Sequence, residues 1–529
     1  MYFAGSIDSS PLRCHKHNFE GHPLQLPRMI HKIFGAFLLL SLALSACSRS
    51  GSSGVPFQLS ESSAPADDNT GSAAGEELSR LDTAPERTLY SINATLDYAS
   101  GVITAQQRID FVNPAGRPLN EVRFNVPPAR RAGAVELRDV RIHGADTPLT
   151  FSLDDAMLVV QLPAALAAGD AIAIAFDFTI RIPLQEVVAG IGGDDTSRGP
   201  YSLTAGHWYV MLAPFRNGAW DTPAYVPIGD PYTSELADYE VSILAPDDII
   251  VAGAGDERRE GRLWNYSLQK ARVFAFAASD SYSVETLVQN GVTYIHYGYP
   301  AHKQHGGDVL ITAARAVELF TKLYGPYPYS SLRIVETGRQ QGQEYSAMVG
   351  LGSILYDGYP GRGSRHDLIA TTVHETAHQW WFNVVGSDQI RAPWLDESFA
   401  RMAELRFYQS YYDADSDWWF THYITSRRPV GPIDLSLAEY ADSSAYITGV
   451  YQRGLLFLND VRKKLGRERF DEMLRDYYGA QQYSITSQDA FFDALARHSN
   501  EDMRPLVRGY FAKPVTLPCV ISGGESGCR

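Results

Sequence analysis

Residues 372 to 381 read TVHETAHQWW, and this stretch decides how the rest of the chain is interpreted. It lies in a segment from Asp367 to Val385 whose pattern predicts a helix. His374 and His378 are four residues apart, so one helical turn brings both imidazoles to the same face. Neutral imidazole is a good zinc ligand, and Glu375 can lean over the metal site as a general base. The alternative is a purely structural pair of helix histidines.

A second stretch, residues 394 to 400 with the sequence WLDESFA, offers a third ligand. Eighteen residues separate His378 from Glu397, which stands at the start of a second predicted helix, Leu395 to Tyr412. Three protein ligands leave a fourth position open for water, which is typical of a catalytic zinc site, and no Cys is near in sequence to complete a structural one. The pattern therefore predicts one zinc ion per chain. The alternative for Glu397 is a solvated carboxylate favoured by the dipole at a helix start.

These two stretches together resemble the aminopeptidase N family of gluzincin zinc metallopeptidases, and the resemblance covers roughly residues 87 to 515. It implies a thermolysin-like, α-rich catalytic domain that hydrolyses the N-terminal peptide bond of peptides. By this resemblance His374, His378 and Glu397 hold the metal and Glu375 is the general base.

The family also carries an exopeptidase signature about thirty residues before the zinc motif, and residues 342 to 348, GQEYSAM, are similar to it. The resemblance implies that Glu344 binds the free α-amino group of the substrate. Gln343 stands where the family usually has Met, and Tyr345 where it often has Asn. A second alignment, which places Ala347 and Met348 on the signature, would put Val349 at the carboxylate position.

A downstream Tyr of the family, in a Tyr-x-Lys-Gly context, is matched by residues 451 to 454, YQRG. The resemblance implies that Tyr451 donates its phenol hydrogen to the developing oxyanion. Tyr446 is a close competitor for this role. Tyr451 is also explained as a core residue near the start of an amphipathic helix predicted from Val450 to Leu465.

The fold class expected is α+β with several domains. Period-two alternation between residues 87 and 297 predicts a mostly antiparallel β domain. Its candidate strands include Val273 to Ala277. From 298 to 515 helical patterns dominate, which predicts the α-rich catalytic domain, and residues 516 to 529 form a tail. Gly386 is expected to stop the zinc helix.

The N-terminal region predicts export. Met29 to Cys47 combines a weakly basic start, a short apolar run and small residues before Cys47, which resembles a bacterial lipobox. Residues 1 to 46 are thus expected to be start overhang and lipoprotein signal peptide, with Cys47 lipidated. An ordinary signal peptide or an uncleaved anchor is the alternative. Residues 47 to 86, rich in Ser, Gly, Ala and acidic residues, read as a flexible tether to the cell envelope, on the periplasmic face or the outer membrane.

Composition limits the partners. The net charge of −15 argues against a nucleic-acid partner, because phosphate binding needs clustered Lys and Arg. Cys519 and Cys528 either form a disulfide or remain free thiols. The oligomeric state is left open.

Three functions compete at this stage. The first is a zinc aminopeptidase that acts on peptides. The second is a zinc endopeptidase or another zinc hydrolase of the same fold. The third is a surface lipoprotein whose peptidase fold binds without catalysis.

Overall fold

The computed structural model describes residues 81, 83–184, 195–517, 521–522 and 525–526. The expected lipidation site at Cys47, the signal segment before it and nearly all of the tether lie outside the described residues. Cys519 and Cys528 also lie outside them, so their pairing stays a prediction. Residues 72 to 529 cluster into one unit, which holds all the residues that the structure describes.

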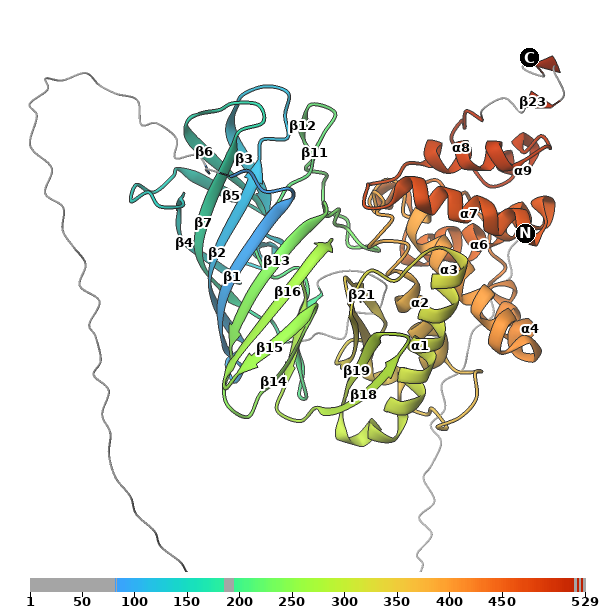
Figure 1. Ribbon diagram of the computed structural model, residues 1–529, viewed down its shortest axis with the longest axis horizontal. Coiled ribbons are helices and arrows are strands. Elements are labelled where there is room, and N and C mark those ends of the chain that lie inside the picture. Colours follow the sequence, from blue (N-terminus) through green and yellow to red (C-terminus); the bar gives the residue numbers. More distant parts are fainter. Residues whose placement is uncertain (1–80, 82, 185–194, 518–520, 523–524, 527–529) are drawn as a thin grey trace, which may run out of the picture. The chain divides into compact units, whose positions relative to one another are not determined.

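A seven-stranded sheet organises the first half of the chain (Figure 1). Neighbouring strands are antiparallel except β1 and β13, which run parallel. In spatial order the strands are β15 (Asp256–Glu260), β16 (Leu263–Ala271), β13 (Ala237–Leu244), β1 (Thr88–Asp97), β2 (Val102–Val112), β7 (Ala171–Arg181) and β4 (Val135–Ile142).

Three smaller sheets complete the β domain. The first contains β10 (Met211–Leu212), β3 (Leu119–Asn125), β6 (Met157–Leu166) and β5 (Phe151–Asp154); the second contains β14 (Ile250–Gly253), β17 (Phe276–Ser279), β9 (Leu203–Ala205) and β8 (Thr196–Arg198); the third is a hairpin of β11 (Phe215–Arg216) and β12 (Ala219–Trp220). A shared hydrophobic core that includes Ile103, Phe124 and Phe176 joins them. The mostly antiparallel β domain is therefore confirmed, although the strand expected at Val273 to Ala277 begins only at Phe276.

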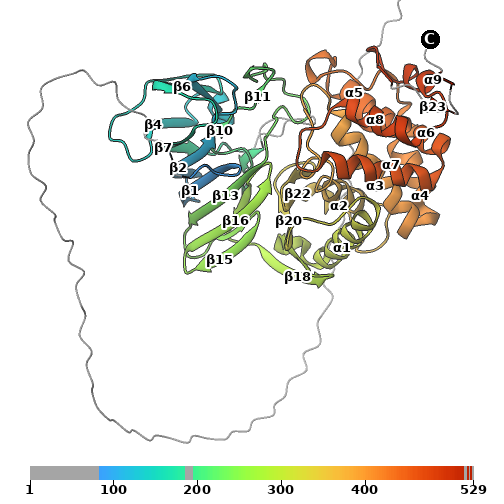
Figure 2. The ribbon, with the colours of Figure 1, turned by 45° about the horizontal axis from the view of Figure 1, so that its top comes forward.

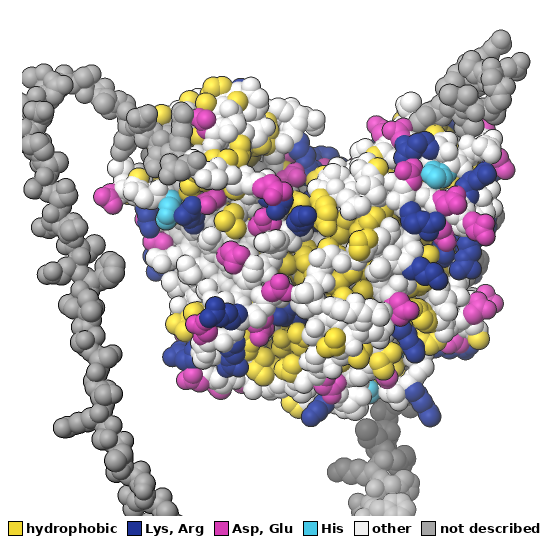
Figure 3. Space-filling view, in the orientation of Figure 1, with side chains coloured by type: hydrophobic (Ala, Val, Ile, Leu, Met, Phe, Trp, Pro, Cys, Tyr) yellow, Lys and Arg dark blue, Asp and Glu magenta, His cyan; other side chains and the backbone are white. Residues whose placement is uncertain are grey.

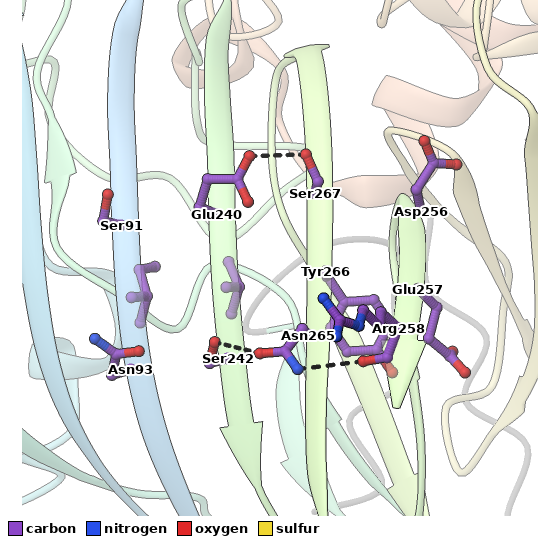
Figure 4. A pocket seen from close by; sticks show the side chains of 12 residues that line it. Ser91, Asn93, Glu240, Ser242, Asp256, Glu257, Arg258, Asn265, Tyr266 and Ser267 are labelled. Carbon is purple, nitrogen blue, oxygen red and sulfur yellow. Dashed lines mark hydrogen bonds between the residues drawn. The ribbon is translucent and has the colours of Figure 1, made fainter. Parts of the chain in front are cut away.

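Alternation along the strands of the large sheet leaves one of its faces polar. Asn93, Ser242, Asn265 and Arg258 form a row across β1, β13, β16 and β15 in register. This face carries a shallow groove of about 410 Å³ (Figure 4), in which Ser242 donates a 2.7 Å hydrogen bond to Asn265. Side chains that hydrogen-bond to one another across strands are what a solvated sheet face requires.

A mixed five-stranded sheet begins the second half. Its order is β18 (Ser283–Gln289), β19 (Val292–Gly298), β20 (Ser331–Thr337), β22 (Met348–Gly352) and β21 (Gln343–Tyr345). The three central strands are parallel and the two edge strands antiparallel to them. The helices α1 (Gly306–Leu323) and α2 (Asp367–Ala377) pack beside this sheet (Figures 1 and 2). The sequence places the domain boundary between residues 297 and 298, whereas β18 and nearly all of β19, which lie before it, pair with this sheet.

Helices make up the rest of the chain (Figure 2). They are α3 (Trp394–Tyr411), α4 (Asp413–Tyr423), α5 (Ser443–Tyr446), a π-helical segment (Ile447–Arg453), α6 (Gly454–Leu465), α7 (Arg467–Gln481), α8 (Gln488–His498) and α9 (Arg504–Arg508), followed by the short strands β23 (Ile521–Ser522) and β24 (Glu525–Ser526). The α-rich second half is confirmed. Of the helices in the described part of the chain, none is both long enough and apolar enough to cross a bilayer.

The zinc helix is shorter than the sequence predicts, so the expected extent of Asp367 to Val385 is wrong. It ends at Ala377 because the chain tightens there: the amides of Gln379 and Trp380 bond to carbonyls three residues back. Gly386 is therefore no helix stop. It pairs with Ile485, and a Cβ there would lie 2.5 Å from the Arg272 guanidinium carbon.

Arg272 joins the β domain to the catalytic region. Its guanidinium is buried and donates to the carbonyls of Asn383 at 3.2 Å and Ser484 at 2.7 Å. Its backbone amide donates to Ser346 Oγ at 2.9 Å. These bonds hold the β domain against the turn that follows the zinc helix and against the loop between β21 and β22.

Candidate metal centre and its surroundings

The three predicted metal ligands meet in one place. His374 stands in the last turn of α2, His378 caps that helix, and Glu397 lies in the first turn of α3. Their ligand atoms all lie within 4.8 Å of one another, and all three side chains are buried. Glu397 Oε2 is 3.0 Å from His374 Nε2 and 3.6 Å from His378 Nε2. His378 keeps helical backbone angles although α2 has ended, so the i and i+4 geometry survives.

Two further carboxylates orient the imidazoles. His374 Nδ1 lies 2.7 Å from Glu404 Oε1, and His378 Nδ1 lies 2.7 Å from Asp396 Oδ1. With the Nδ1 protons donated to these acceptors, the Nε2 lone pairs point towards the Glu397 carboxylate, which is also an acceptor. A group of acceptors that face one another requires a cation between them, and two nitrogens with one carboxylate are a donor set that suits zinc. The residues present therefore fit the metal.

Glu404 is the most heavily bonded of these carboxylates. It is fully buried on α3 and accepts from Arg401 Nη1 at 2.7 and 2.9 Å and from Trp419 Nε1 at 3.1 Å. The sequence analysis missed both Glu404 and Asp396. Glu404 follows Glu397 by seven residues, two helical turns, so it lies on the same helix face, and this spacing was the available signal.

Electrostatics at the ligands follow from these contacts. Burial by itself would raise the pKa of Glu397, but interaction with the protonated, positively charged forms of His374 and His378 outweighs burial and holds that pKa well below its usual range. Burial likewise opposes charge on His374, yet its bonds to Glu397 and Glu404 raise its pKa. The anionic form of Glu397 is thus the stable one in this setting.

Glu375 lies where a general base is needed. It is buried, and its Oε2 has no hydrogen-bond partner among the described residues, so it is free to take a proton. Burial raises its pKa to about 7, against the opposing charges of His374 and His378. The backbone at Gly342 passes so close that a Cβ there would lie 2.1 Å from Glu375 Oε1. A side chain at position 342 would displace the carboxylate.

Glu344 reaches the same site from strand β21. Gln379, directly after the second histidine, clamps the loop beyond this strand: its side chain donates to the Tyr345 carbonyl at 2.8 Å and accepts from the Ala347 amide at 2.9 Å. Carboxylate and imidazole atoms of Glu344, Glu375 and His378 lie within 4.8 Å of one another. Val349, the alternative carboxylate position, is buried in the hydrophobic core on β22.

Neutral amides surround the Glu344 carboxylate. It accepts from Gln343 Nε2 at 3.0 Å and from Gln389 Nε2 at 3.4 Å. Gln343 Nε2 also donates to Asp230 Oδ1 at 3.2 Å, which brings a β-domain carboxylate into the site. Burial, then the charge of Asp230, raises the pKa of Glu344 well above its usual range. The sequence does not predict Asp230 as a metal ligand or as the general base, because no local motif marks it.

The two tyrosines lie side by side with different contacts. Tyr451 donates a short hydrogen bond to Glu397 Oε1, and its ring stacks 5.8 Å from that of His374. Tyr446 packs edge-on against Tyr451 at 5.6 Å, and a Cβ at Gly229 would lie 2.7 Å from its hydroxyl. Tyr451 therefore stands at the ligands, and Tyr446 lies one ring further out, under the β-domain loop.

Charges on the surface are mixed rather than segregated. On the face seen in Figure 3, acidic and basic side chains are interspersed. The concentration of carboxylates around the metal ligands is therefore a property of the buried site and not of this face.

Parts of the chain are similar in sequence to known proteins. Residues 347–510 match the peptidase family M1 domain. Over 264 residues the chain is 28% identical to aminopeptidase N of Lactobacillus helveticus, a match that covers 45% of this chain and 30% of that protein. Over 258 residues it is 28% identical to the mitochondrial aminopeptidase 2 of Saccharomyces cerevisiae, covering 44% of this chain and 26% of the relative. These matches span less than a third of the length of either relative.

Solved structures share the fold over a longer stretch. A point mutant of the M1 zinc metallopeptidase of Deinococcus radiodurans aligns with a TM-score of 0.61 and 17% identity, covering 83% of this chain and 96% of that one. The same mutant enzyme bound to a Tyr-Ser-Ala substrate aligns with a TM-score of 0.58 and 17% identity, covering 82% and 96%. The arrangement of a β domain followed by a helical domain is thus that of known two-domain structures.

Proposed function

Because the chain carries a peptidase M1 domain and is a gluzincin of the aminopeptidase N family, we propose that it is a zinc-dependent aminopeptidase. Its substrates are peptides with a free N-terminus, and it hydrolyses their first peptide bond. The site binds one zinc ion per chain through His374, His378 and Glu397.

The observation that carries the exopeptidase assignment is the position of Glu344. Its carboxylate lies within 4.8 Å of the Glu375 and His378 atoms, directly beside the general base and a metal ligand. An anion there binds the ammonium of a substrate whose first carbonyl faces Glu375. Two covalent bonds separate the α-amine nitrogen of a peptide from its first carbonyl carbon, so an ammonium held at Glu344 presents the first peptide bond to Glu375.

The protein side chains divide the remaining work. When bound, zinc supplies Lewis-acid activation of water and of the scissile carbonyl. Glu375 accepts the proton of the attacking water and passes it to the leaving amine, for which its free Oε2 is available. Tyr451, whose phenol donates to Glu397 in the substrate-free site, turns that hydrogen to the oxyanion that develops on the carbonyl. Asp396 and Glu404 keep both imidazoles in the tautomer that binds metal.

A pair of substrates tests the assignment. The peptide Tyr-Ser-Ala should be cleaved after its first residue, and its N-acetylated twin should not be. Equal cleavage of both would instead identify an endopeptidase or another hydrolase that does not recognise the amine.

A variant tests the chemistry. Glu375→Gln should retain zinc and lose turnover, since an amide cannot accept the proton. Turnover at the wild-type level in metal-loaded Glu375→Gln would remove the general base from its role. Wild-type protein that holds zinc but cleaves no peptide would favour a binding lipoprotein without catalysis.

We also propose that the protein is exported and anchored in the cell envelope through a lipid on Cys47. The support is the lipobox-like sequence that ends at Cys47. Cys47→Ser should move the protein from the membrane fraction to the soluble fraction, and mass spectrometry of the mature N-terminus should show a diacylated cysteine in the wild type. A soluble wild-type protein would contradict the anchor.

A further inference from the structure

A pocket in the helical region, apart from the metal ligands, gathers basic side chains. It has a volume of about 390 Å³ and is lined by residues of three helices, α1, α3 and α7. Of these, α1 packs against both α3 and α7 (Figures 1 and 2). The charged residues that line it are Glu318, Lys322, Arg406, Arg467, Asp471 and Arg475. Basic groups therefore outnumber acidic ones in this pocket, although the whole chain has a net charge of −15.

The central acid of the pocket is already used by its most buried arginine. Arg406 is 1% exposed and donates to both oxygens of Asp471, with Nη2 at 2.8 Å from Oδ2. A bidentate bond of this kind occupies the carboxylate, so Asp471 has little left to offer a second cation. The Nε of Arg406 is also buried and has no hydrogen-bond partner among the described residues.

Two exposed arginines flank Asp471 on one face of α7. Arg467 stands four residues before it and Arg475 four residues after it, a spacing at which helix side chains are neighbours. Among the described residues neither arginine forms an ion pair, because Asp471 is bonded to Arg406 instead. Lys322 on α1 is likewise exposed and unpaired within the described part of the chain. Three cations thus line the pocket without a counter-charge.

A further arginine lies beside this group. Arg462, on α6, donates to the neutral side chains of Asn459, at 2.9 and 3.2 Å, and Gln409, at 3.5 Å. Burial, and then the positive charges of Arg406 and Arg467, lower its pKa. Like charges that are held close together are unfavourable, and an anion bound among them would relieve their repulsion.

We infer that this pocket is a binding site for a small phosphate-bearing organic molecule. A guanidinium presents two parallel N–H donors that match phosphate oxygens, and Arg467 and Arg475 both have theirs free, with Lys322 adding a third charge. The volume lies in the range of small-molecule sites, so the pocket has room for more than the phosphate. Leu319 and Leu323 line it as well, which suits a carbon skeleton. This binding activity goes beyond peptide hydrolysis.

Titration calorimetry of full-length, zinc-loaded protein tests the site with three probes in a phosphate-free buffer. They are inorganic phosphate, glycerol 3-phosphate and the water-soluble short-chain lipid dihexanoyl phosphatidylglycerol. At least one organic probe should bind at one per chain, with an affinity that falls as NaCl is raised. Tighter binding of glycerol 3-phosphate supports a soluble ligand, and tighter binding of the lipid supports a headgroup. Binding of inorganic phosphate alone would overturn the assignment of an organic ligand.

Variants decide whether the heat of binding comes from this pocket or from the metal site, since phosphate oxygens also suit a metal ion. Arg467→Gln and Arg475→Gln should each weaken binding of the organic probe roughly 5- to 10-fold, because each removes one charge-assisted contact from a partly solvated site. Arg469→Gln is the matched control, since Arg469 is an exposed arginine of α7 that does not line the pocket, and it should bind as wild type does. Asp471→Asn should instead tighten binding several-fold, because it removes a negative charge beside the anion and keeps an acceptor for Arg406.

The direction of these effects separates a site from general surface attraction. Circular dichroism verifies that each variant is folded. Absence of binding of all three probes at millimolar concentration would overturn the inference. Equal losses in Arg467→Gln and Arg469→Gln, or weaker binding in a folded Asp471→Asn, would also overturn it. No peptide enters these measurements, so their outcome does not depend on whether the protein is an aminopeptidase.

Discussion

The carboxylate behind the first histidine offers the sharpest test of how the metal site is built. Glu404→Gln is nearly isosteric, so it changes charge and donor pattern and leaves the packing. The glutamine oxygen can still accept from His374 Nδ1, which lies 2.7 Å from Glu404 Oε1. Its NH2 group would then face Arg401 and Trp419, both donors that now bond to the carboxylate. One donor must lose its partner or the amide must turn away from His374.

The magnitude follows from that conflict. Replacement of a carboxylate that orients a metal-bound histidine typically weakens metal binding 10- to 100-fold, which is about 1.4 to 2.8 kcal/mol. Asp396→Asn should weaken zinc binding by a smaller factor. Among the described residues, the only donor to Asp396 Oδ2 is the Gln389 amide, at 2.8 Å, which can rotate to present its oxygen instead at the loss of its long, 3.4 Å bond to Glu344. We therefore expect the zinc dissociation constant to rise by the larger factor in Glu404→Gln and by the smaller one in Asp396→Asn.

Competition with a chromogenic chelator measures both dissociation constants, at neutral pH and with circular dichroism to verify folding. Glu240→Gln is the control, because Glu240 lies on the polar sheet face and, among the described residues, its side chain hydrogen-bonds only to Ser267. Zinc affinity in Glu404→Gln equal to that of the control would refute the view that Glu404 orients His374. The reverse order of the two variants would refute the donor-conflict argument.

Further expectations concern the base, the phenol and the acid stability of the fold. Gly342→Ala should keep zinc and lower kcat about 100-fold, because its Cβ would push the Glu375 carboxylate aside; steady-state rates beside metal content decide this, and an unchanged kcat would count against it. Tyr451→Phe should lower kcat roughly 100- to 1,000-fold with little change in KM, whereas Tyr446→Phe should stay near wild type; equal losses in both variants would contradict the assignment. Burial lowers the pKa of His296 to about 4, below its unfolded value near 6.5, so the unfolded chain takes up the proton first as the pH falls. The contribution of His296 to the free energy of unfolding is therefore full above pH 6.5 and falls by up to about 3 kcal/mol as the pH drops towards 4. Urea unfolding between pH 4.5 and 7 should show a shallower pH dependence in His296→Gln, and identical slopes in both proteins would exclude this source.

The metal ligands were predictable because the spacing of these residues along the chain is enough to place them in one site. Two histidines four apart and a glutamate at the start of the next helix need only regular helix geometry to be placed correctly. The early end of α2 did not disturb this, since His378 keeps helical angles as the cap. Helices also followed from periodicity, which is why α3, Trp394–Tyr411, lies within one residue of the predicted Leu395 to Tyr412.

What the sequence could not supply are contacts between distant segments. Asp230 meets Gln343 across 113 positions of the chain, and no local pattern signals such a meeting. Glu404 is separated from His374 by 30 residues, although its spacing from Glu397 gave a usable hint. The domain boundary also depends on a distant contact. β19 pairs with β20, which starts at Ser331, so β18 and β19 join the sheet of the catalytic region. Gly386 misled because a glycine that allows close approach of Arg272 looks, in sequence, like a helix stop.

The central claim is that His374, His378 and Glu397 converge on a single zinc ion whose remaining coordination position is open to water and substrate. Anomalous diffraction from crystals of the purified protein, collected on both sides of the zinc absorption edge, tests it most directly. We predict one anomalous peak per chain, bonded to both Nε2 atoms and to the Glu397 carboxylate, with no further protein ligand. A peak with a fourth protein donor, or a peak elsewhere in the molecule, would contradict the account.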